Sequence, residues 1–508
     1  MRKVVTIAVA VAAMAGATVS GVSQARTVTA ADTATPKQDI KWGQCDKDVG
    51  DGLPLPEGMQ CGTLKVPLDY QKPEGRTIDI AVSRVPSKNP EKRRGILLTN
   101  PGGPSPGLGY LAFLVTVKMP KAVLDSYDLI GFDPRGMGRS TPVKCDLTEE
   151  QQIFGNIPPY ARNAGEVAKR AEQSRQIAEQ CAAADTAWML PYVSAKNTAR
   201  DMDSIRTALG AEKTSYLGAS WGTYLGSVYA TMFPNRTDRV VLDSNLGPAG
   251  WDYQSQRLWS QGMDDRFPDF AKYVAANHRE YGLGRTAAQV KAKYLQLAAR
   301  LDRTPVKGPD VVWDGALLRL ITFGYSYGAT QLATLAEVVK ALEANQPPPP
   351  LPAGETAKAT AASVDNLISA RYYMICNDSH WPTSLKSYQR NVAIDRIRHP
   401  LFGAAGANIN PCAYWPKPVE EPVKVGGNGP SNVLMVQNLR DPATPLAGAE
   451  QLRKALGDRA RMVTADQGGH GVYLLNKNQC ANTAATSFLL TGKLPDRDYH
   501  CSADATPR

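Results

Sequence analysis

The stretch that decides the fold is Ser215-Tyr216-Leu217-Gly218-Ala219-Ser220-Trp221-Gly222, which leads into residues 223–233 and then Pro234. Residues 215–217 read as a short strand, and the glycines at 218 and 222 favour a sharp turn because glycine lets the backbone pass closely. A helix then continues to Pro234, which cannot extend it. With a further β-like run from Arg239 to Leu242, the sequence predicts strand, turn, helix and strand in immediate succession.

The turn itself has the pattern Gly-x-Ser-x-Gly, which between a strand and a helix is typical of a nucleophile elbow. Such a turn exposes the serine hydroxyl, here that of Ser220, at the top of the strand. A glycine-rich turn with a capping serine is the alternative, and the strand, turn and helix in order argue against it. We therefore expect Ser220 to be a catalytic nucleophile.

A serine nucleophile needs a histidine base, and in this motif's fold the chain order is serine, acid, histidine. The histidine that suits this role is His470, in Gly468-Gly469-His470-Gly471, because a glycine-rich loop just after the last predicted core strand can reach the elbow. The other four histidines lie in an inserted region or in the tail, at positions 278, 380, 399 and 500.

The acid that completes the set is expected at Asp441, in the loop after the predicted strand Val433 to Val436. That loop and the helix after it lead directly to His470. The rival is Asp243, which ends the strand after the elbow helix and occupies the position that carries the acid in some hydrolases. Asp441 is the prediction, with Asp243 as the alternative.

A tetrahedral intermediate needs backbone N–H donors for its oxyanion. Trp221 supplies one because it follows the nucleophile, and the turn Gly102-Gly103 supplies the other because glycine permits close backbone approach. An ordinary tight turn is the alternative for the two glycines.

The rest of the chain predicts a mostly parallel sheet flanked by helices, the α/β-hydrolase fold. Three further β-like runs precede the elbow, and two of them end in glycine-rich turns, as strands that alternate with helices do. The pattern after residue 246 changes to long helical segments. We therefore expect a core over 41–246, an inserted helical lid over 247–429 and a second core part over 430–508. The three β-like runs before the elbow are Thr77–Val85, Ile96–Leu98 and Tyr127–Phe132.

The first residues read as an export signal over 1–25, with a positive start, an apolar run from Val4 to Val22 and small residues up to Ala25. A membrane anchor is the alternative, disfavoured by several polar and small residues in the run. Residues 26–40 are expected to be a pro-segment or a disordered arm. We expect a secreted protein without stable membrane association after the signal is removed.

The eight cysteines are an even number in an exported chain, which favours disulfides over metal ligands. None forms a Cys-x-x-Cys pair, and no His-Glu-x-x-His occurs, so we expect no metal and no cofactor. Sequence alone leaves the pairing open. Joining neighbours in order gives Cys45 with Cys61, Cys145 with Cys181, Cys376 with Cys412, and Cys480 with Cys501.

The formal charge of +10 does not predict a nucleic-acid partner. Lysine and arginine are spread along the chain, and the cluster at 92–94 precedes a strand. Binding a polynucleotide requires a continuous basic surface, often with aromatic platforms.

Five motifs together give the chain a family resemblance. They are residues 100–104, Asp133-Pro134-Arg135-Gly136-Met137-Gly138-Arg139-Ser140, the elbow at 218–222, 441–445 and 469–471. With these motifs the chain resembles secreted tripeptidyl aminopeptidases of actinomycete type, which are relatives of proline iminopeptidases, over nearly the whole mature chain and including a TAP-like C-terminal part. One departure is Ser105-Pro106 in place of the expected glycines after the Gly-Gly-Pro turn.

The resemblance implies a serine exopeptidase that forms an acyl-enzyme and releases short peptides, tripeptides first among them, from free N-termini. A lid carboxylate should then hold the substrate ammonium, since an ion pair is stronger in a pocket of low dielectric. Asp378, beside a predicted disulfide, ranks before the pair Asp264-Asp265. The alternatives are a secreted carboxylic ester hydrolase and, from another class, a non-catalytic binding protein on a hydrolase scaffold.

Overall fold

The computed structural model describes residues 39–309, 311–328, 331–350 and 361–504. The predicted export signal, 1–25, and residues 26–38 of the predicted arm lie outside the described residues.

A single large sheet forms the core of the described chain. Its strands lie in the order β1-β2-β3-β5-β4-β6-β7-β10-β11-β12. Their bounds are β1 Gly43–Gln44, β2 Gln60–Pro67, β3 Thr77–Val85, β4 Gly95–Asn100, β5 Tyr127–Phe132, β6 Thr214–Ala219, β7 Thr237–Asp243, β10 Val433–Arg440, β11 Ala460–Gly468 and β12 Tyr499–Cys501.

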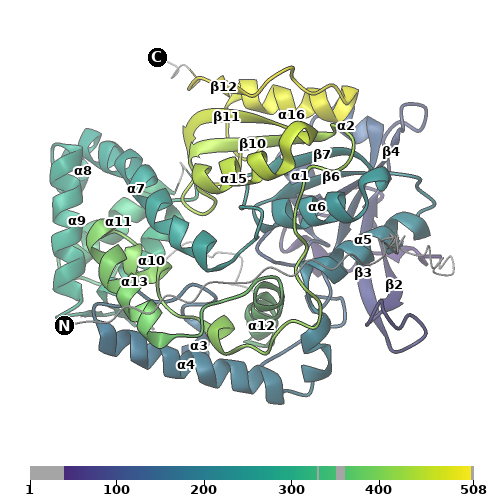
Figure 1. The fold of residues 1–508 in the computed structure, drawn as a ribbon. Helices are drawn as coiled ribbons and strands as arrows, with labels where there is room; N and C mark the ends of the chain where they lie inside the picture. The colour runs from purple at the N-terminus through teal and green to yellow at the C-terminus, as the bar shows by residue number, and fades with distance from the viewer. Residues whose placement is uncertain (1–38, 310, 329–330, 351–360, 505–508) are drawn as a thin grey trace, which may run out of the picture. The chain divides into compact units, whose positions relative to one another are not determined.

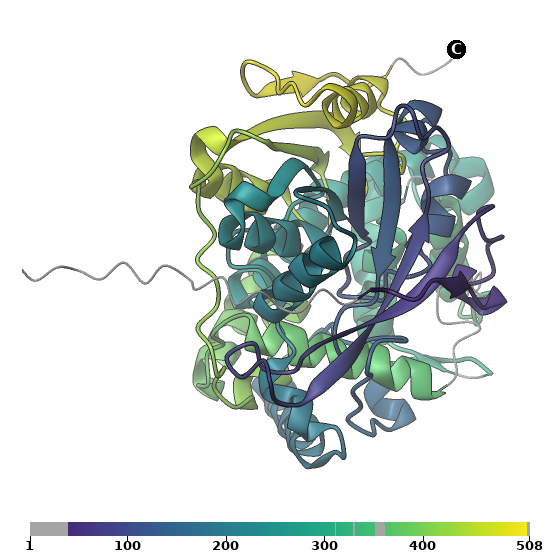
Figure 2. The ribbon, with the colours of Figure 1, turned by 90° about the vertical axis from the view of Figure 1, so that its right-hand side faces the viewer.

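The pairing is antiparallel at one end of this sheet and parallel through the rest. Strands β1, β2, β3 and β5 pair antiparallel in that order, and this end faces the viewer in Figure 2. From β5 through β4, β6, β7, β10 and β11 to β12 every pairing is parallel. The predicted α/β class with a mostly parallel sheet is confirmed. Because the parallel strands share a direction, the loops after β4, β6, β7, β10 and β11 all leave the sheet at the same edge.

Helices cover both faces of the sheet. Successive residues of a strand point to opposite faces, and the apolar residues of β4 therefore contribute to the packing on each side. In β4, Ile96 and Leu98 belong to the apolar cluster that includes residues of the helices α5 Ala195–Ala208, α6 Trp221–Met232 and α15 Leu446–Leu456. Leu97, between them, belongs to the cluster on the opposite face, which includes residues of α1 Tyr110–Thr116, α2 Lys121–Ser126 and α16 Gln479–Thr491. Figure 1 shows α15 and α16 on either side of β10 and β11.

The predicted lid region, 247–429, is helical, apart from a short hairpin of β8 Val306–Lys307 and β9 Val312–Trp313. Several of its helices share an apolar cluster of their own, which includes Phe270, Leu297 and Leu335. The helices are α7 Tyr253–Ala276, α8 His278–Tyr281, α9 Ala287–Leu301, α10 Gly315–Tyr325, α11 Leu332–Glu343, α12 Ala361–Asn377, α13 Leu385–Arg398 and α14 Gly403–Gly406, with the 3-10 turn η4 Pro411–Tyr414.

A segment from before the elbow joins this helical layer. It holds α3 Glu149–Gln152, α4 Ala164–Ala183 and the 3-10 turn η2 Ala187–Tyr192, and α4 packs against α13 and η4. Asp365 of α12 accepts hydrogen bonds from the backbone N–H groups of Asp146 and Leu147. The helices over the carboxyl edge of the strands therefore come from two separate stretches of sequence, as Figure 1 shows at α4 and α12.

Four disulfides join all eight cysteines, in the predicted neighbour pairing. They are Cys45–Cys61, Cys145–Cys181, Cys376–Cys412 and Cys480–Cys501. Each closes a loop within one region of the fold. Among the helices in the described ranges, none is both long enough and apolar enough to cross a membrane.

Candidate active site

Ser220 sits in the strained turn that the sequence predicts. Its backbone has φ 55° and ψ −125°, between the end of β6 and the start of α6. A non-glycine residue in such a conformation is costly and persists only where its surroundings hold it. The Ser220 N–H donates to the Asp243 carbonyl of β7 at 2.9 Å. The glycines are required because a Cβ at Gly222 would lie 2.7 Å from Asn100 Oδ1.

His470 and Asp441 meet directly. Nδ1 of His470 lies 2.9 Å from Oδ2 and 3.0 Å from Oδ1 of Asp441, whose side chain is fully buried. An ionised carboxylate only accepts, so the proton of the imidazole lies on Nδ1 and Nε2 is left as the basic nitrogen. The Asp441–His470 pair that the sequence analysis preferred is therefore formed.

Thr444 completes the acid loop and was not identified from the sequence. Its N–H and that of Ala443 each donate to Asp441 Oδ1 at 2.9 Å, and its hydroxyl donates to Oδ2 at 2.9 Å. The same hydroxyl oxygen lies 3.3 Å from His470 Nδ1. These bonds fix the rotamer of the carboxylate. The signal in the sequence was Asp441-Pro442-Ala443-Thr444, in which an Asx turn brings the hydroxyl back to the acid.

Asp243, the alternative acid, forms hydrogen bonds to the backbone of the loop that carries His470 and not to the imidazole. Its carboxylate accepts the N–H groups of Val472 and Tyr473 at 2.8 Å each, and the neighbouring Ser244 hydroxyl accepts the N–H of Gly471 at 2.8 Å. Because Asp243 also bonds the backbone of Ser220, the loop of His470 is tied to the elbow. Burial raises the pKa of Asp243 to about 6, against the lowering effect of these hydrogen bonds.

The environment of His470 favours its charged form. Burial by itself would lower the pKa of His470, but the charge and the hydrogen bond of Asp441, together with the nearby charge of Asp243, raise it above the ordinary value. This is the electrostatic condition for an imidazole that takes up a proton during a reaction.

The glycine turn after β4 packs against the elbow. A Cβ at Gly102, where φ is 92°, would lie 2.7 Å from Ser220 Cβ and 3.1 Å from the backbone nitrogen of Trp221. The N–H of Gly102 donates to Asn100 Oδ1 at 2.9 Å, and the Ser105 hydroxyl donates to the Gly102 carbonyl at 2.8 Å. Because Gly102 has no side chain, the turn can pack closely against the elbow, and the Gly102 N–H forms its hydrogen bond within the turn. The Ser105 hydroxyl stabilises the turn.

The Asp133 to Ser140 motif serves the architecture of this edge. The Asp133 carboxylate accepts the N–H groups of Gly107, Leu108 and Arg139, so it ties its own loop to the chain that follows the glycine turn. Arg135 is fully buried and pairs with Asp201 at 2.6 Å. Neither side chain contacts Ser220 or His470 among the described residues.

The three carboxylates predicted to bind the substrate amine lie at two places in the lid. Asp378 is buried after α12, where Oδ1 accepts the N–H of Ala195 at 2.7 Å and Oδ2 has no hydrogen-bond partner within the described structure. Burial raises its pKa well above the ordinary range. Asp264 on α7 lies 2.7 Å from His399 Nδ1, and its neighbour Asp265 is exposed. Within the described residues, no hydrogen bond joins any of the three carboxylates to the Asp441–His470 pair.

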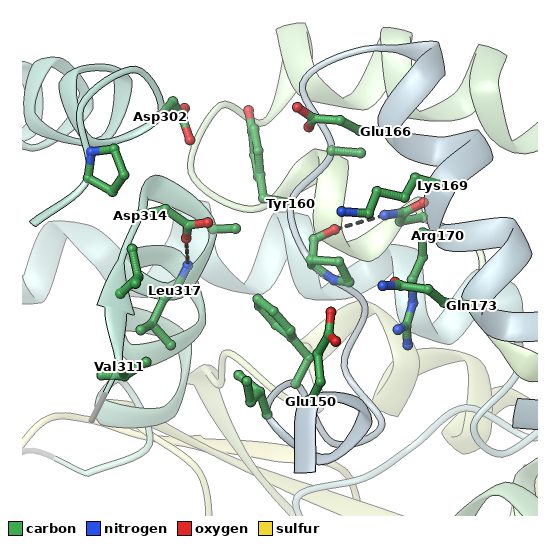
Figure 3. Close-up of a pocket in the computed structure, with 18 of the residues that line it drawn as sticks. Glu150, Tyr160, Glu166, Lys169, Arg170, Gln173, Asp302, Val311, Asp314 and Leu317 are labelled. Atoms are coloured by element: carbon green, nitrogen blue, oxygen red, sulfur yellow. Dashed lines mark hydrogen bonds between the residues drawn. The ribbon is translucent and has the colours of Figure 1, made fainter. Parts of the chain in front are cut away.

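A cavity of about 1110 Å³ lies away from these residues, between α3 and α4 on one side and α9, α10 and the β8–β9 hairpin on the other. Lys169 and Arg170 line it from α4, and Asp302 and Asp314 line it from the opposite wall (Figure 3). Neither Ser220 nor His470 is among its lining residues. In the described parts of the chain, no three His, Cys, Asp or Glu side chains gather as metal ligands.

The strand order, the elbow at Ser220 and the Asp441–His470 pair at the carboxyl edge of the sheet define the class of protein. They are the features of α/β-hydrolases that use a serine nucleophile.

The comparisons with known proteins narrow this class. Over 501 residues the chain is 36% identical to the tripeptidyl aminopeptidase of Streptomyces lividans, which covers 96% of this chain and 90% of the relative. It is 29% identical to the serine protease Hip1 of Mycobacterium tuberculosis, over 92% of each chain, and 28% identical to carboxylesterase B of the same species, over 93% and 91%. A family model described as TAP-like protein matches residues 399–501. The chain belongs to the tripeptidyl aminopeptidase family of serine hydrolases.

Proposed function

We propose that this protein is a serine exopeptidase that releases short peptides, tripeptides first among them, from the free N-termini of peptide substrates. The observation that carries the proposal is the pair of His470 Nδ1 and Asp441 at 2.9 Å, on a loop tied by Asp243 to the elbow of Ser220. The relatives named tripeptidyl aminopeptidase and serine protease support the choice of a peptide bond as the target.

In the proposed acylation step, Ser220 Oγ attacks the carbonyl carbon of the scissile amide and His470 Nε2 takes the hydroxyl proton. Asp441 stabilises the imidazolium and holds its orientation. The carbonyl oxygen becomes an oxyanion, for which the N–H groups of Trp221 and Gly103 are the proposed donors. Collapse of the intermediate breaks the C–N bond, and His470 returns the proton to the departing amine.

Deacylation repeats this chemistry with water. His470 takes a proton from a water molecule, whose oxygen attacks the acyl-enzyme carbonyl, and the proton then returns to Ser220 Oγ as the ester bond breaks. The released acid is the N-terminal peptide. Ser220, His470 and the attacking water suffice for each proton transfer in these steps.

For recognition of the substrate ammonium, Asp378 remains the first candidate among the lid carboxylates. One oxygen of its buried carboxyl group has no hydrogen-bond partner within the described structure. Burial raises the pKa of this carboxyl and disfavours its charge, so in the proposed site the substrate ammonium restores the charge and forms an ion pair with it. Asp264 is already paired with His399, and Asp265 faces solvent. These two are the second candidates.

We propose further that the protein is exported and acts outside the cell. The export-type segment 1–25 and the four disulfides support this location, because disulfides form and persist in oxidising compartments.

The experiment that tests the proposed activity compares three substrates: a tripeptidyl amide with a free N-terminus, its N-acetylated form with the same leaving amine, and a short acyl ester. The wild type should cleave the free tripeptidyl amide best, and Ser220→Ala should cleave none. Asp378→Asn should weaken cleavage of the free substrate much more than that of the acetylated one, with Asp264→Asn and Asp265→Asn as matched variants. Equal losses on both substrates would remove Asp378 from the amine site.

A carboxylic ester hydrolase is the second candidate, and a specific finding favours it, namely the relative named carboxylesterase B. The same acyl-enzyme steps serve an ester carbonyl. A preference of the wild type for the short acyl ester, with no cleavage of the tripeptidyl amide, would establish this alternative.

A further inference from the structure

One face of the lid helix α7 lies against both loops that carry the acid and the histidine. Gly262, Arg266 and Asp269 are spaced at i, i+4 and i+7, so they form a single stripe along the helix. A Cβ at Gly262 would lie 2.8 Å from the Asp441 carbonyl and 2.6 Å from that of Pro442. The helix therefore touches the acid loop through a residue that has no side chain to keep it away.

The next residue of the stripe reaches the histidine loop and a second part of the lid. The Arg266 side chain is 3% exposed, and a Cβ at Gly468 would collide with its guanidinium. Nε of Arg266 donates to the Ser326 carbonyl at 2.9 Å, and Nη1 donates to Asp269 Oδ2 at 2.7 Å. Arg266 thus connects α7, the end of α10 and the approach to His470.

The third residue extends the contact into the core strands. Asp269 Oδ2 also accepts from Arg440 Nε at 3.0 Å, and Arg440 Nη1 donates to Asp466 Oδ1 at 2.6 Å. Arg440 ends β10 immediately before Asp441, and its carbonyl accepts the N–H of Gly469 at 3.0 Å. The ion pairs therefore run from α7 to Arg440, the residue before Asp441, and the carbonyl of Arg440 bonds Gly469, the residue before His470.

Tyr327, which follows α10 in the lid, contacts the histidine itself. Its carbonyl accepts the backbone N–H of His470 at 2.7 Å, and its ring packs edge-on against the imidazole with centroids 4.9 Å apart. A Cβ at Gly469, where φ is 111°, would lie 2.5 Å from that carbonyl. The ring also packs edge-on against Phe323 of α10, which fixes it from behind.

We propose that the lid is a positioning part of the catalytic apparatus, and that Arg266 and Tyr327 are positioning residues that hold His470 and Asp441 in their reactive geometry. The inference deepens the proposed function, on which it rests, because it assigns the lid a role beyond limiting access. A lid moved away from the core would leave the His470 N–H without its acceptor and the imidazole without one packed face. Proton transfer is steeply sensitive to such placement, so the lid position controls kcat.

The test compares Arg266→Ala, Tyr327→Ala and Tyr327→Phe with the control Arg257→Ala. Arg257 lies on the same helix and makes its ion pair with Asp395 within the lid, at 2.8 Å, so its loss disturbs the lid without reaching the acid–base pair. Each variant is assayed well below its unfolding temperature, for kcat and KM on the tripeptidyl amide. The rate at which a small fluorophosphonate labels Ser220 is measured as well, because that reaction needs His470 but no peptide-binding contacts.

Arg266→Ala and Tyr327→Ala should each lower kcat and the labelling rate by about 10²-fold, the typical effect of a displacement near 1 Å, while KM changes by no more than about threefold. Tyr327→Ala and Tyr327→Phe both keep the backbone carbonyl, but only Tyr327→Phe keeps the ring, so it should stay within about fivefold of the wild type. A labelling rate in both alanine variants equal to that of Arg257→Ala would overturn the proposal. Failure of the proposed function is distinguished separately, because wild type would then cleave no peptide while labelling normally.

Discussion

The substitution Asp441→Asn separates the role of the acid's charge from that of its shape. In the structure, Asp441 Oδ1 accepts two backbone N–H groups, from Ala443 and Thr444, and lies 3.0 Å from His470 Nδ1, whereas Oδ2 lies 2.9 Å from Nδ1 and accepts the Thr444 hydroxyl. Asparagine would keep its carbonyl oxygen where the two N–H groups point, and its NH₂ group would take the place of Oδ2 beside the imidazole. An NH₂ hydrogen directed at Nδ1 repels an Nδ1 proton, so the substitution favours the tautomer with the proton on Nε2.

That tautomer cannot accept a proton from Ser220, and the positive imidazolium also loses its counter-charge. We expect kcat to fall by about 10⁴-fold, equivalent to about 5 kcal/mol of transition-state stabilisation. The folded state should persist, since the side chain keeps its volume and its backbone bonds.

The assay is steady-state cleavage of the tripeptidyl amide, with circular dichroism to confirm folding and Asp243→Asn as the matched control. Asp243 accepts buried backbone N–H groups of the histidine loop and has no hydrogen bond to the imidazole. Its variant loses one of these acceptors but keeps the Asp441–His470 pair, so it should lower kcat by a smaller factor than Asp441→Asn does. An Asp441→Asn enzyme near wild-type rate beside an inactive Asp243→Asn enzyme would refute the assignment of the acid.

Three further outcomes follow from the same structure. Only neutral imidazole accepts a proton, and the pKa of His470 is raised, so kcat/KM in a pH–rate profile should rise with pH through a midpoint above 6.5. Asp441→Asn removes the charge that raises this pKa and should move the midpoint to lower pH. Replacing Cys376 and Cys412 together by alanine opens a loop with a sequence separation of 36 and should lower the free energy of unfolding by about 4 kcal/mol in a denaturant titration; an unchanged midpoint would contradict this. Arg135→Met removes the ion-pair partner of the fully buried Asp201 carboxylate and should lower the free energy of unfolding by about 3 to 5 kcal/mol in the same titration. A decrease below about 1 kcal/mol would show that Asp201 is accommodated without its partner.

The core of the fold could be predicted because its signals are local. The predicted strands Thr77–Val85 and Tyr127–Phe132 have the same bounds in the structure as β3 and β5. Strong hydrophobic runs that end in glycine or proline leave few alternatives. The neighbour pairing of the cysteines was correct for a related reason, since each disulfide joins chain segments that are close in sequence.

The interactions between distant segments could not be predicted in the same way. Nothing in the sequence of α4 indicates that it packs with α13. The Asx turn of Asp441 to Thr444 marks the bond of Thr444 to the acid but not its approach to His470, and Tyr327 has no motif that marks a contact with His470. Such contacts depend on tertiary geometry, which local periodicity does not encode. The functional roles of Ser220, Asp441 and Asp378 remain predictions that the experiments above address.

The most direct test of the central claim is to trap the acyl-enzyme. Wild-type enzyme is mixed with a tripeptidyl ester that has a free N-terminus, quenched with acid within the first turnovers, digested, and analysed by mass spectrometry. We predict an adduct on Ser220 with the mass of the tripeptide acyl group, which grows when deacylation is slowed at low pH and is absent from Ser220→Ala. Turnover of this substrate with no adduct on Ser220, or with an acyl group on another residue, would contradict the proposed mechanism.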